Sequence, residues 1–137
     1  MNIDQRIYGY IAREETFPDK TVIIEEGSLG RWVFIILEGQ VKVNKRTPKG
    51  LVTIDILKQG ATFGESEFFE KGNEVRTISV IADGSVRLGL LDSDQLVKDY
   101  ESISPQIKGL VRALIRELRH TTDNVVAMAV HSRANRQ

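Results

Sequence analysis

The chain has 137 residues, which suits one domain with a hydrophobic core of its own. Nineteen Lys and Arg balance nineteen Asp and Glu, so the net charge demands neither nucleic acid nor a membrane as partner. The absence of Cys excludes disulfides and thiolate metal sites, and no apolar run reaches the ~18 residues that indicate a membrane span. We expect a cytoplasmic protein without membrane contact.

The N-terminal segment, residues 2–13, places apolar side chains at helical spacing and predicts a short amphipathic helix. From about residue 14 to residue 92, short β-branched and aromatic runs alternate with glycines at nearly regular intervals. This pattern is typical of an antiparallel sandwich or barrel. We therefore expect a β-roll over residues 14–92.

Two helices are predicted after the β-roll. Asp92, Ser93 and Asp94 can cap a helix that reaches Tyr100, because their side chains accept hydrogen bonds from the free N–H groups of a first turn. Ser104-Pro105 opens a second helix, which meets no breaker before about Val130. The C-terminal helices are thus expected over residues 93–130 of a single domain that spans residues 1–137.

The long helix carries an apolar stripe at alternating spacings of four and three residues, which is a heptad pattern. Its members are Ile107, Val111, Leu114, Leu118, Thr121, Val125 and Met128. Such a stripe can pack on the β-roll of its own domain, or it can form a parallel two-helix seam with a second copy. We favour the seam, and therefore a homodimer through the C-terminal helix. The flanking arginines Arg112, Arg116 and Arg119 are expected to face solvent.

A short cassette between two predicted strands carries the candidate binding groups. Gly64 and Glu65 open a tight turn after Phe63, and eleven residues after Glu65 the cation of Arg76 stands beside the hydroxyl of Thr77. A sugar hydroxyl needs an acceptor, and a phosphate needs a fixed cation together with N–H donors. The cassette predicts a pocket for a sugar phosphate.

Each of these residues also has a purely structural interpretation. Glu65 is consistent with an ordinary turn residue, and Arg76 with an ion pair to Glu67 or Glu70 across the loop. Thr77 suits a strand by propensity. Thr121 suits a polar seam position that fixes helix register.

With these elements in this order, the chain resembles the cyclic nucleotide-binding domain family over about residues 10–130. The motifs that carry the resemblance are Glu26-Gly27, the strand Phe34 to Val41 with its glycine turn, Phe63-Gly64-Glu65 and Arg76-Thr77. The resemblance implies a mainly β fold, a double-stranded β-helix (jelly-roll β-roll) with an N-terminal helix and two C-terminal helices, the last one long.

The resemblance also implies roles for the cassette. Glu65 would accept a hydrogen bond from the ribose 2′-hydroxyl, Arg76 would pair with the cyclic phosphate, and Thr77 would donate to the same anion. Beyond the turn at Gly64, the backbone N–H groups of Ser66 and Glu67 would face the phosphate from the start of a short helix.

On the long helix, Thr121-Thr122 matches the hydroxyl pair with which catabolite activator-like receptors touch the adenine. A hydroxyl such as that of Thr77 occurs in cAMP and cGMP receptors alike. The Thr121-Thr122 pair leans toward adenine, so we place cAMP ahead of cGMP.

Two positions depart from the family pattern. Glu67 stands where a small residue is usual, and a carboxylate about 5 Å from the phosphate, at an effective dielectric near 20, would cost roughly 3 kcal/mol. Ile78 stands where alanine is common. Both residues put the middle of the phosphate site in doubt.

The expected function is that of a cyclic nucleotide-sensing regulatory domain. The ligand would draw the C-terminal helix over the pocket about a hinge at Ser102 to Pro105. The signal would then pass to an unidentified effector protein. The alternative is a degenerate domain that acts as an interaction scaffold without nucleotide. We expect no enzyme activity, cofactor or metal site, because the two histidines, His120 and His131, lie in the C-terminal helix and its tail. We also expect no direct DNA binding, since no helix-turn-helix follows the long helix.

Overall fold

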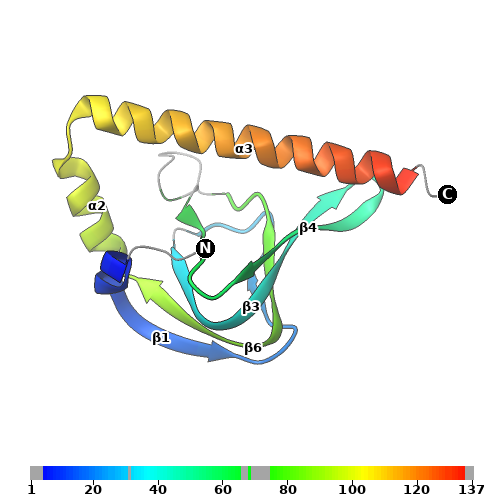
Figure 1. Cartoon of the computed structure of the whole chain (residues 1–137), viewed down its shortest axis with the longest axis horizontal. Coiled ribbons are helices and arrows are strands. Elements are labelled where there is room, and N and C mark those ends of the chain that lie inside the picture. The colour runs from blue at the N-terminus through cyan, green and yellow to red at the C-terminus, as the bar shows by residue number, and fades with distance from the viewer. Residues whose placement is uncertain (1–4, 31, 66–67, 69–74, 135–137) are drawn as a thin grey trace.

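In the computed structural model, residues 5–30, 32–65, 68 and 75–134 are described (Figure 1). A 3₁₀ helix, η1, opens the chain and is followed by the strands of one antiparallel sheet and then by two helices. The elements are η1 (Gln5–Tyr10), β1 (Ile11–Phe17), β2 (Val22–Ile24), β3 (Phe34–Thr47), β4 (Gly50–Lys58), β5 (Thr62–Phe63), β6 (Ser79–Leu91), α2 (Ser93–Ser102) and α3 (Pro105–Ala134). This order confirms the predicted jelly-roll β-roll with a long last helix.

The sheet is built around β6 and β3, in the order β1-β6-β3-β4, with β2 pairing with β6 and β5 pairing with β3. Both central strands are long and shift register where they pair between Ile36 and Gln40. Gly39 allows the strands to approach there, since its φ is +90° and a Cβ would lie 2.5 Å from the carbonyl oxygen of Ser85. Bends of this kind curl the sheet into a roll (Figure 1).

The first strand corrects the predicted N-terminal helix. Helical structure ends at Tyr10, and Ile11 to Arg13 instead belong to β1, where Ile11 pairs with Leu91 and Arg13 with Leu90. Pairing with the end of β6 satisfies the backbone of this segment and overrides its helical spacing.

The core has two parts, because alternate residues of β3 face opposite sides of the sheet. Phe34 and Ile36 belong to the larger cluster inside the roll, which also contains Phe63 and residues of β6. Val33 and Ile35 belong to a smaller cluster that packs against η1 and α2. Each fully buried side chain of this size stabilises the fold by roughly 1.5–3 kcal/mol.

The predicted caps are present at both helices. The side chain of Asp92 accepts a hydrogen bond from the backbone N–H of Gln95 at 3.1 Å, and Ser104 accepts one from Ile107 at 3.2 Å ahead of α3. The joint between the helices is spanned by Lys108, whose Nζ lies 3.1 Å from Glu101 and over the ring of Tyr100. Within the described ranges, no helix combines the length and apolar character needed to cross a bilayer.

Helix α3 crosses the open side of the roll as one rod and passes near β4 (Figure 1). Among the α3 side chains that the structure describes, Ile115 is buried and Val111 is half-buried. The other members of the predicted stripe are exposed, among them Leu114 and Leu118 at 54% and 59%. Apart from Val111, the stripe is therefore not buried against the β-roll of its own domain.

Candidate functional site

A cavity of about 520 Å³ lies between the inner face of the roll and α3. On the side of the β-roll its apolar wall consists of Ile24, Val43, Ile54, Leu57, Phe63 and Ile78. Polar and charged side chains reach it from the cassette, from α3 and from the strands. An apolar enclosure of this size with a few convergent polar groups is typical of a small-molecule site.

At the cassette end, the predicted phosphate residue Arg76 is only 4% exposed. Its guanidinium donates from Nη1 to the carbonyl oxygen of Gly64 at 3.2 Å and from Nη2 to that of Trp32 at 2.9 Å. A buried guanidinium has its position fixed by such bonds, so the cation is held in place beside the cavity.

Gly64 makes this arrangement possible. Its φ is +88°, and a Cβ at this position would lie 2.5 Å from the carbonyl oxygen of Trp32 and 3.0 Å from Nη1 of Arg76. The contact with the Trp32 carbonyl is too close for a side chain, the contact with Nη1 is tight, and the conformation itself favours glycine. The glycine that the sequence marked as a turn residue is thus also required for the approach of Arg76.

The backbone of Arg76 is held by the loop that contains the Glu26-Gly27 motif. The N–H of Gly27 donates to the carbonyl of Arg76, and the N–H of Arg76 donates to the carbonyl of Ser28, both at 2.8 Å. The N–H of Glu26 donates to the hydroxyl of Ser79 at 2.9 Å. Two motifs that are about fifty residues apart in the sequence therefore form one structural unit.

The predicted ribose acceptor and hydroxyl donor also line the cavity. Glu65 and Thr77 lie in its wall together with Gly64 and Arg76, and Oε2 of Glu65 is buried. The structure thus brings four of the predicted cassette residues to one cavity. The other two, Ser66 and Glu67, lie outside the described residues, as does the predicted alternative partner Glu70.

From its side of the cavity, α3 contributes both predicted hydroxyl residues, Thr121 and Thr122. The hydroxyl of Thr122 donates to the carbonyl of Leu118 at 2.9 Å. Because its proton is used within the helix, this oxygen presents lone pairs to a further partner.

The prediction that Arg119 faces solvent is wrong. Arg119 lines the cavity, and its Nε and Nη2 atoms are buried. It lies three residues before Thr122 and four before Asp123, which also lines the cavity, so all three share one face of α3. The spacing between Arg119 and Thr122, a predicted site residue, is the signal in the sequence that could have indicated its place at the cavity.

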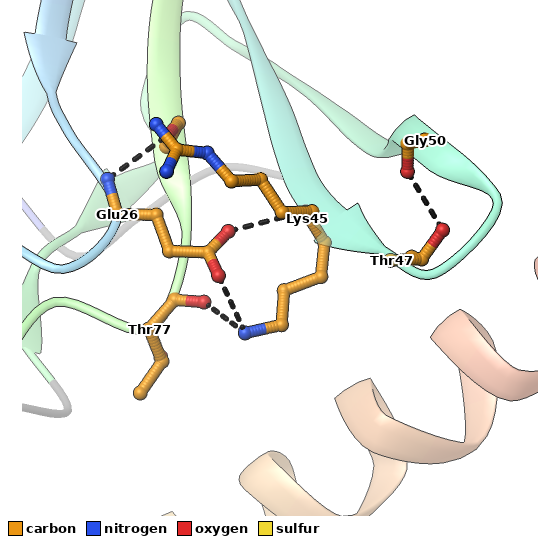
Figure 2. A network of polar contacts seen from close by, with 7 residues as sticks. Glu26, Lys45, Thr47, Gly50 and Thr77 are labelled. Atoms are coloured by element: carbon orange, nitrogen blue, oxygen red, sulfur yellow. Dashed lines mark hydrogen bonds and ion pairs between the residues drawn. The ribbon is translucent and has the colours of Figure 1, made fainter.

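Two further charged residues of the cavity, Lys45 and Asp55, were not singled out by the sequence. Lys45 donates to Oε2 of Glu26 at 3.1 Å and to the carbonyl of Thr77 at 2.7 Å. Figure 2 shows its ammonium group between these two acceptors. The chemistry of the cavity is thus binding chemistry, with cations, carboxylates and hydroxyls around an apolar wall. In the part of the chain that the structure describes, no three His, Cys, Asp or Glu side chains gather to hold a metal ion.

Comparison with known proteins places this geometry in context. A CRP-like cAMP-activated global transcriptional regulator of Mycobacterium tuberculosis is 33% identical over 113 residues, which are 80% of this chain and 48% of the regulator. The chain thus spans about half the length of the curated relative that it matches.

Solved structures give the same picture. The EAL enzyme Bd1971 in its cAMP and cyclic-di-GMP bound form is 26% identical, with a TM-score of 0.73 over 82% of this chain and 29% of the enzyme. Its cGMP bound form matches with 26% identity and a TM-score of 0.71 over 84% of this chain and 30% of the enzyme. The regulatory domain of Toxoplasma gondii PKA, crystallised with cAMP, is 25% identical with a TM-score of 0.62 over 83% of this chain and 43% of that domain.

The family model described as "Cyclic nucleotide-binding domain" matches residues 14–101, which contain the whole cassette and the strands that hold it. These regulatory domains share the β-roll and the terminal helices found here. The chain belongs to the cyclic nucleotide-binding domain family.

Proposed function

We propose that this domain binds a cyclic mononucleotide in the cavity, cAMP ahead of cGMP, and signals through the position of α3. One observation carries the proposal: the buried guanidinium of Arg76 shares a cavity with Glu65 and Thr77. An organic phosphate is bound well by a fixed, poorly hydrated cation, and a ribose hydroxyl by a nearby carboxylate.

The proposed orientation follows from the cassette and α3 residues in the cavity wall. The cyclic phosphate lies against Arg76 and Thr77, and the ribose hydroxyl lies against Glu65. The base then extends along the apolar wall toward α3. An apolar wall suits the flat faces of a purine, whose polar atoms lie on its edges.

Helix α3 would read the edge of the base. The Thr122 oxygen, whose proton is already donated to Leu118, accepts from an amino group, which adenine presents and guanine replaces by an acceptor at the same edge. The name of the mycobacterial relative, a cAMP-activated regulator, favours adenine as well. Arg119 acts in the other direction, because a guanidinium pairs well with O6 and N7 of guanine. We place cAMP first because Thr121 and Asp123 add further acceptors beside Thr122.

The output would pass through α3, because the helix forms one wall of the cavity. Leu118 and Val125 line the cavity from α3, so a bound base contacts the helix directly. A ligand shifts a conformational equilibrium by its difference in affinity between the two states, and these contacts supply such a difference. The backbone between α2 and α3, at Ser102 to Pro105, is the proposed hinge, and Ile103 there is extended with ψ of 161°.

We further propose a homodimer through α3. The exposed stripe continues along the helix, with Ile107 at 48% and Met128 at 71% exposed besides Leu114 and Leu118. Apolar side chains repeated in heptads on one helix face are the pattern of a two-helix seam. Leu118, Thr121 and Val125 belong to both the stripe and the cavity wall, so the seam would lie directly beside the base.

A thermal-shift titration with cAMP and cGMP tests the proposal. A ligand that binds the folded state alone stabilises it by about 2.7 kcal/mol at 100 times Kd, which raises the Tm by several degrees. We expect a saturable increase with cAMP that is larger than the increase with cGMP at the same concentration. No increase with millimolar amounts of either nucleotide would favour the alternative, an interaction scaffold that has lost its ligand.

A further inference from the structure

The segment that carries Arg76 and Thr77 lies just outside the sheet. Strand β6 begins at Ser79, and the residues before it are reached by one isolated bridge between Leu29 and Val75. The hydrogen bonds that β6 makes within the sheet therefore do not fix the backbone conformation of Arg76 and Thr77. Their conformation depends on contacts made to them from elsewhere in the roll.

Arg76 receives such contacts from the backbone of Gly27 and Ser28. The next peptide is held by Lys45, whose Nζ donates to the carbonyl oxygen of Thr77 at 2.7 Å (Figure 2). Because a peptide unit is planar, a bond to this carbonyl also fixes the N–H of Ile78 and the ψ angle of Thr77.

Lys45 is itself held in place by Glu26. The Lys45 ammonium lies 3.1 Å from Oε2 of Glu26, and both side chains are largely buried, at 25% and 17% exposure. The other carboxylate oxygen of Glu26 accepts a hydrogen bond from the backbone N–H of Arg46 at 2.9 Å. Strand β3, the loop at Glu26 and the Thr77 peptide are thereby joined through one ammonium group.

The charges show what this arrangement can do. The carboxylate of Glu26 compensates the ammonium at close range, so the pair adds little net attraction for an anion in the cavity. Its effect on a bound phosphate must then come from geometry. A carbonyl oxygen turned toward an anion would repel it, and an ammonium that keeps the Thr77 carbonyl engaged prevents this rotation.

We propose that Lys45, oriented by Glu26, is a positioning residue for the phosphate site: it sets the peptide of Thr77 so that the groups of Arg76 and Thr77 converge on one anion. The inference rests on the proposed function, since it concerns the same site. It gives a role to a lysine near the end of β3 that no motif of the sequence marks.

The test uses Lys45→Met, which keeps the length of the side chain and removes the donor, with Lys45→Arg as the conservative variant. Lys42→Met is the matched control, because Lys42 is on the same strand, is 46% exposed and lies 3.9 Å from Asp83 outside the network. Affinity for cAMP is measured by calorimetry at two salt concentrations. Amide chemical shifts of Thr77 and Ile78 are recorded without ligand.

We expect Lys45→Met to weaken cAMP binding about tenfold, the usual effect of one lost charge-assisted hydrogen bond, with an unchanged salt dependence. The amide signals of Thr77 and Ile78 should shift in the ligand-free variant. Lys45→Arg should recover most of the affinity, and Lys42→Met should bind like the wild type. If Lys45→Met does not fold, Glu26→Gln provides the same test, since it keeps the acceptor for Arg46 and weakens the hold on Lys45.

Three results would overturn the inference. Equal affinity of Lys45→Met and wild type would remove any role in binding. Weaker binding with unshifted ligand-free amides, or with a reduced salt dependence, would make Lys45 a direct contact of the ligand instead. A wild-type protein that binds neither cAMP nor cGMP would remove the proposed function, and this inference with it.

Discussion

The guanidinium of Arg76 donates to the carbonyl oxygen of Gly64 at 3.2 Å, across twelve residues of sequence. This bond joins the two ends of the cassette, the turn that opens it and the cation that closes it. A site that is already assembled before the ligand arrives loses less conformational entropy on binding. Substitutions that loosen either end of the cassette should therefore lower the affinity for the ligand, even where the substituted residue does not contact the ligand.

Gly64→Ala should damage the site. A Cβ at residue 64 would lie 2.5 Å from the Trp32 carbonyl and 3.0 Å from Nη1 of Arg76, at a φ of +88° that alanine adopts poorly. We expect a lower Tm and at least tenfold weaker nucleotide binding, as measured by calorimetry, since a left-handed alanine alone costs ~1 kcal/mol and the displaced cation adds to this.

Gly109→Ala is the matched control for that variant. Gly109 lies within α3, and a Cβ added there would have nothing within 4 Å, so the same substitution should stabilise the helix by roughly 0.5–1 kcal/mol. We therefore expect the stability to fall in Gly64→Ala and to rise in Gly109→Ala. A tolerated Gly64→Ala would contradict the close packing of Arg76.

The base preference should depend on two residues of α3 in opposite ways. Thr122→Val removes an acceptor for an amino group and should weaken the binding of cAMP more than that of cGMP. Arg119→Gln removes a donor that suits guanine and should weaken the binding of cGMP more than that of cAMP. Each change should move the ratio of the two dissociation constants by about three- to tenfold, since one hydrogen bond is worth about 1 kcal/mol. If both variants leave the ratio unchanged, α3 does not read the base.

The oligomeric state should depend on the exposed stripe of α3. Leu114→Glu places a charge in the middle of the stripe and should convert a dimer into a monomer in analytical ultracentrifugation, because an unpaired charge is costly in a dry seam. Ala113→Glu introduces the same side chain beside the stripe, on an exposed position, and should leave the dimer intact. A wild-type protein that sediments as a monomer at high concentration would refute the seam.

The contact between η1 and α2 should show itself at alkaline pH. The hydroxyl of Tyr10 donates to Asp99 at 2.5 Å, and this hydrogen bond, with burial and the charge of Asp99, raises the pKa of Tyr10 above 10.0. A raised pKa means that the folded state holds the proton more tightly, so the stabilisation is complete below pH 10 and is lost as the pH rises through the folded-state pKa.

Tyr10→Phe should therefore lower the free energy of unfolding near neutral pH. Above pH 10, the free energy of unfolding of the variant should lack the decline that the titration of Tyr10 causes in the wild type. Urea denaturation of both proteins between pH 7 and pH 11 measures the difference. A wild type and a variant whose stabilities stay parallel over this range would show that Tyr10 does not titrate differently in the folded state.

Local chemistry made part of this structure predictable from the sequence. The caps at Asp92 and Ser104 were found because each acts within one helical turn. The cassette was found because Gly64-Glu65 and Arg76-Thr77 each pair two residue types whose combined chemistry suits a sugar phosphate.

What the sequence could not predict depends on contacts between distant segments. The helix expected to reach Arg13 gives way at Ile11 because the end of β6, eighty residues later, offers a strand to pair with. Lys45 acquires its role from Glu26 and Thr77, which are 19 and 32 residues away. Arg119 lines the cavity because its side of α3 is turned toward the roll, and this orientation depends on tertiary packing rather than on the residues around Arg119.

The most direct test of the central claim is a calorimetric titration of cAMP into the wild type and Arg76→Ala. Arg87→Ala serves as the control, since Arg87 is an arginine of β6 that is 40% exposed and paired with Glu14 rather than placed at the cavity. Loss of a buried charge-assisted contact to phosphate should weaken binding tenfold or more in Arg76→Ala, with the Arg87→Ala protein unchanged. Equal affinities for wild type and Arg76→Ala would contradict a phosphate site at Arg76.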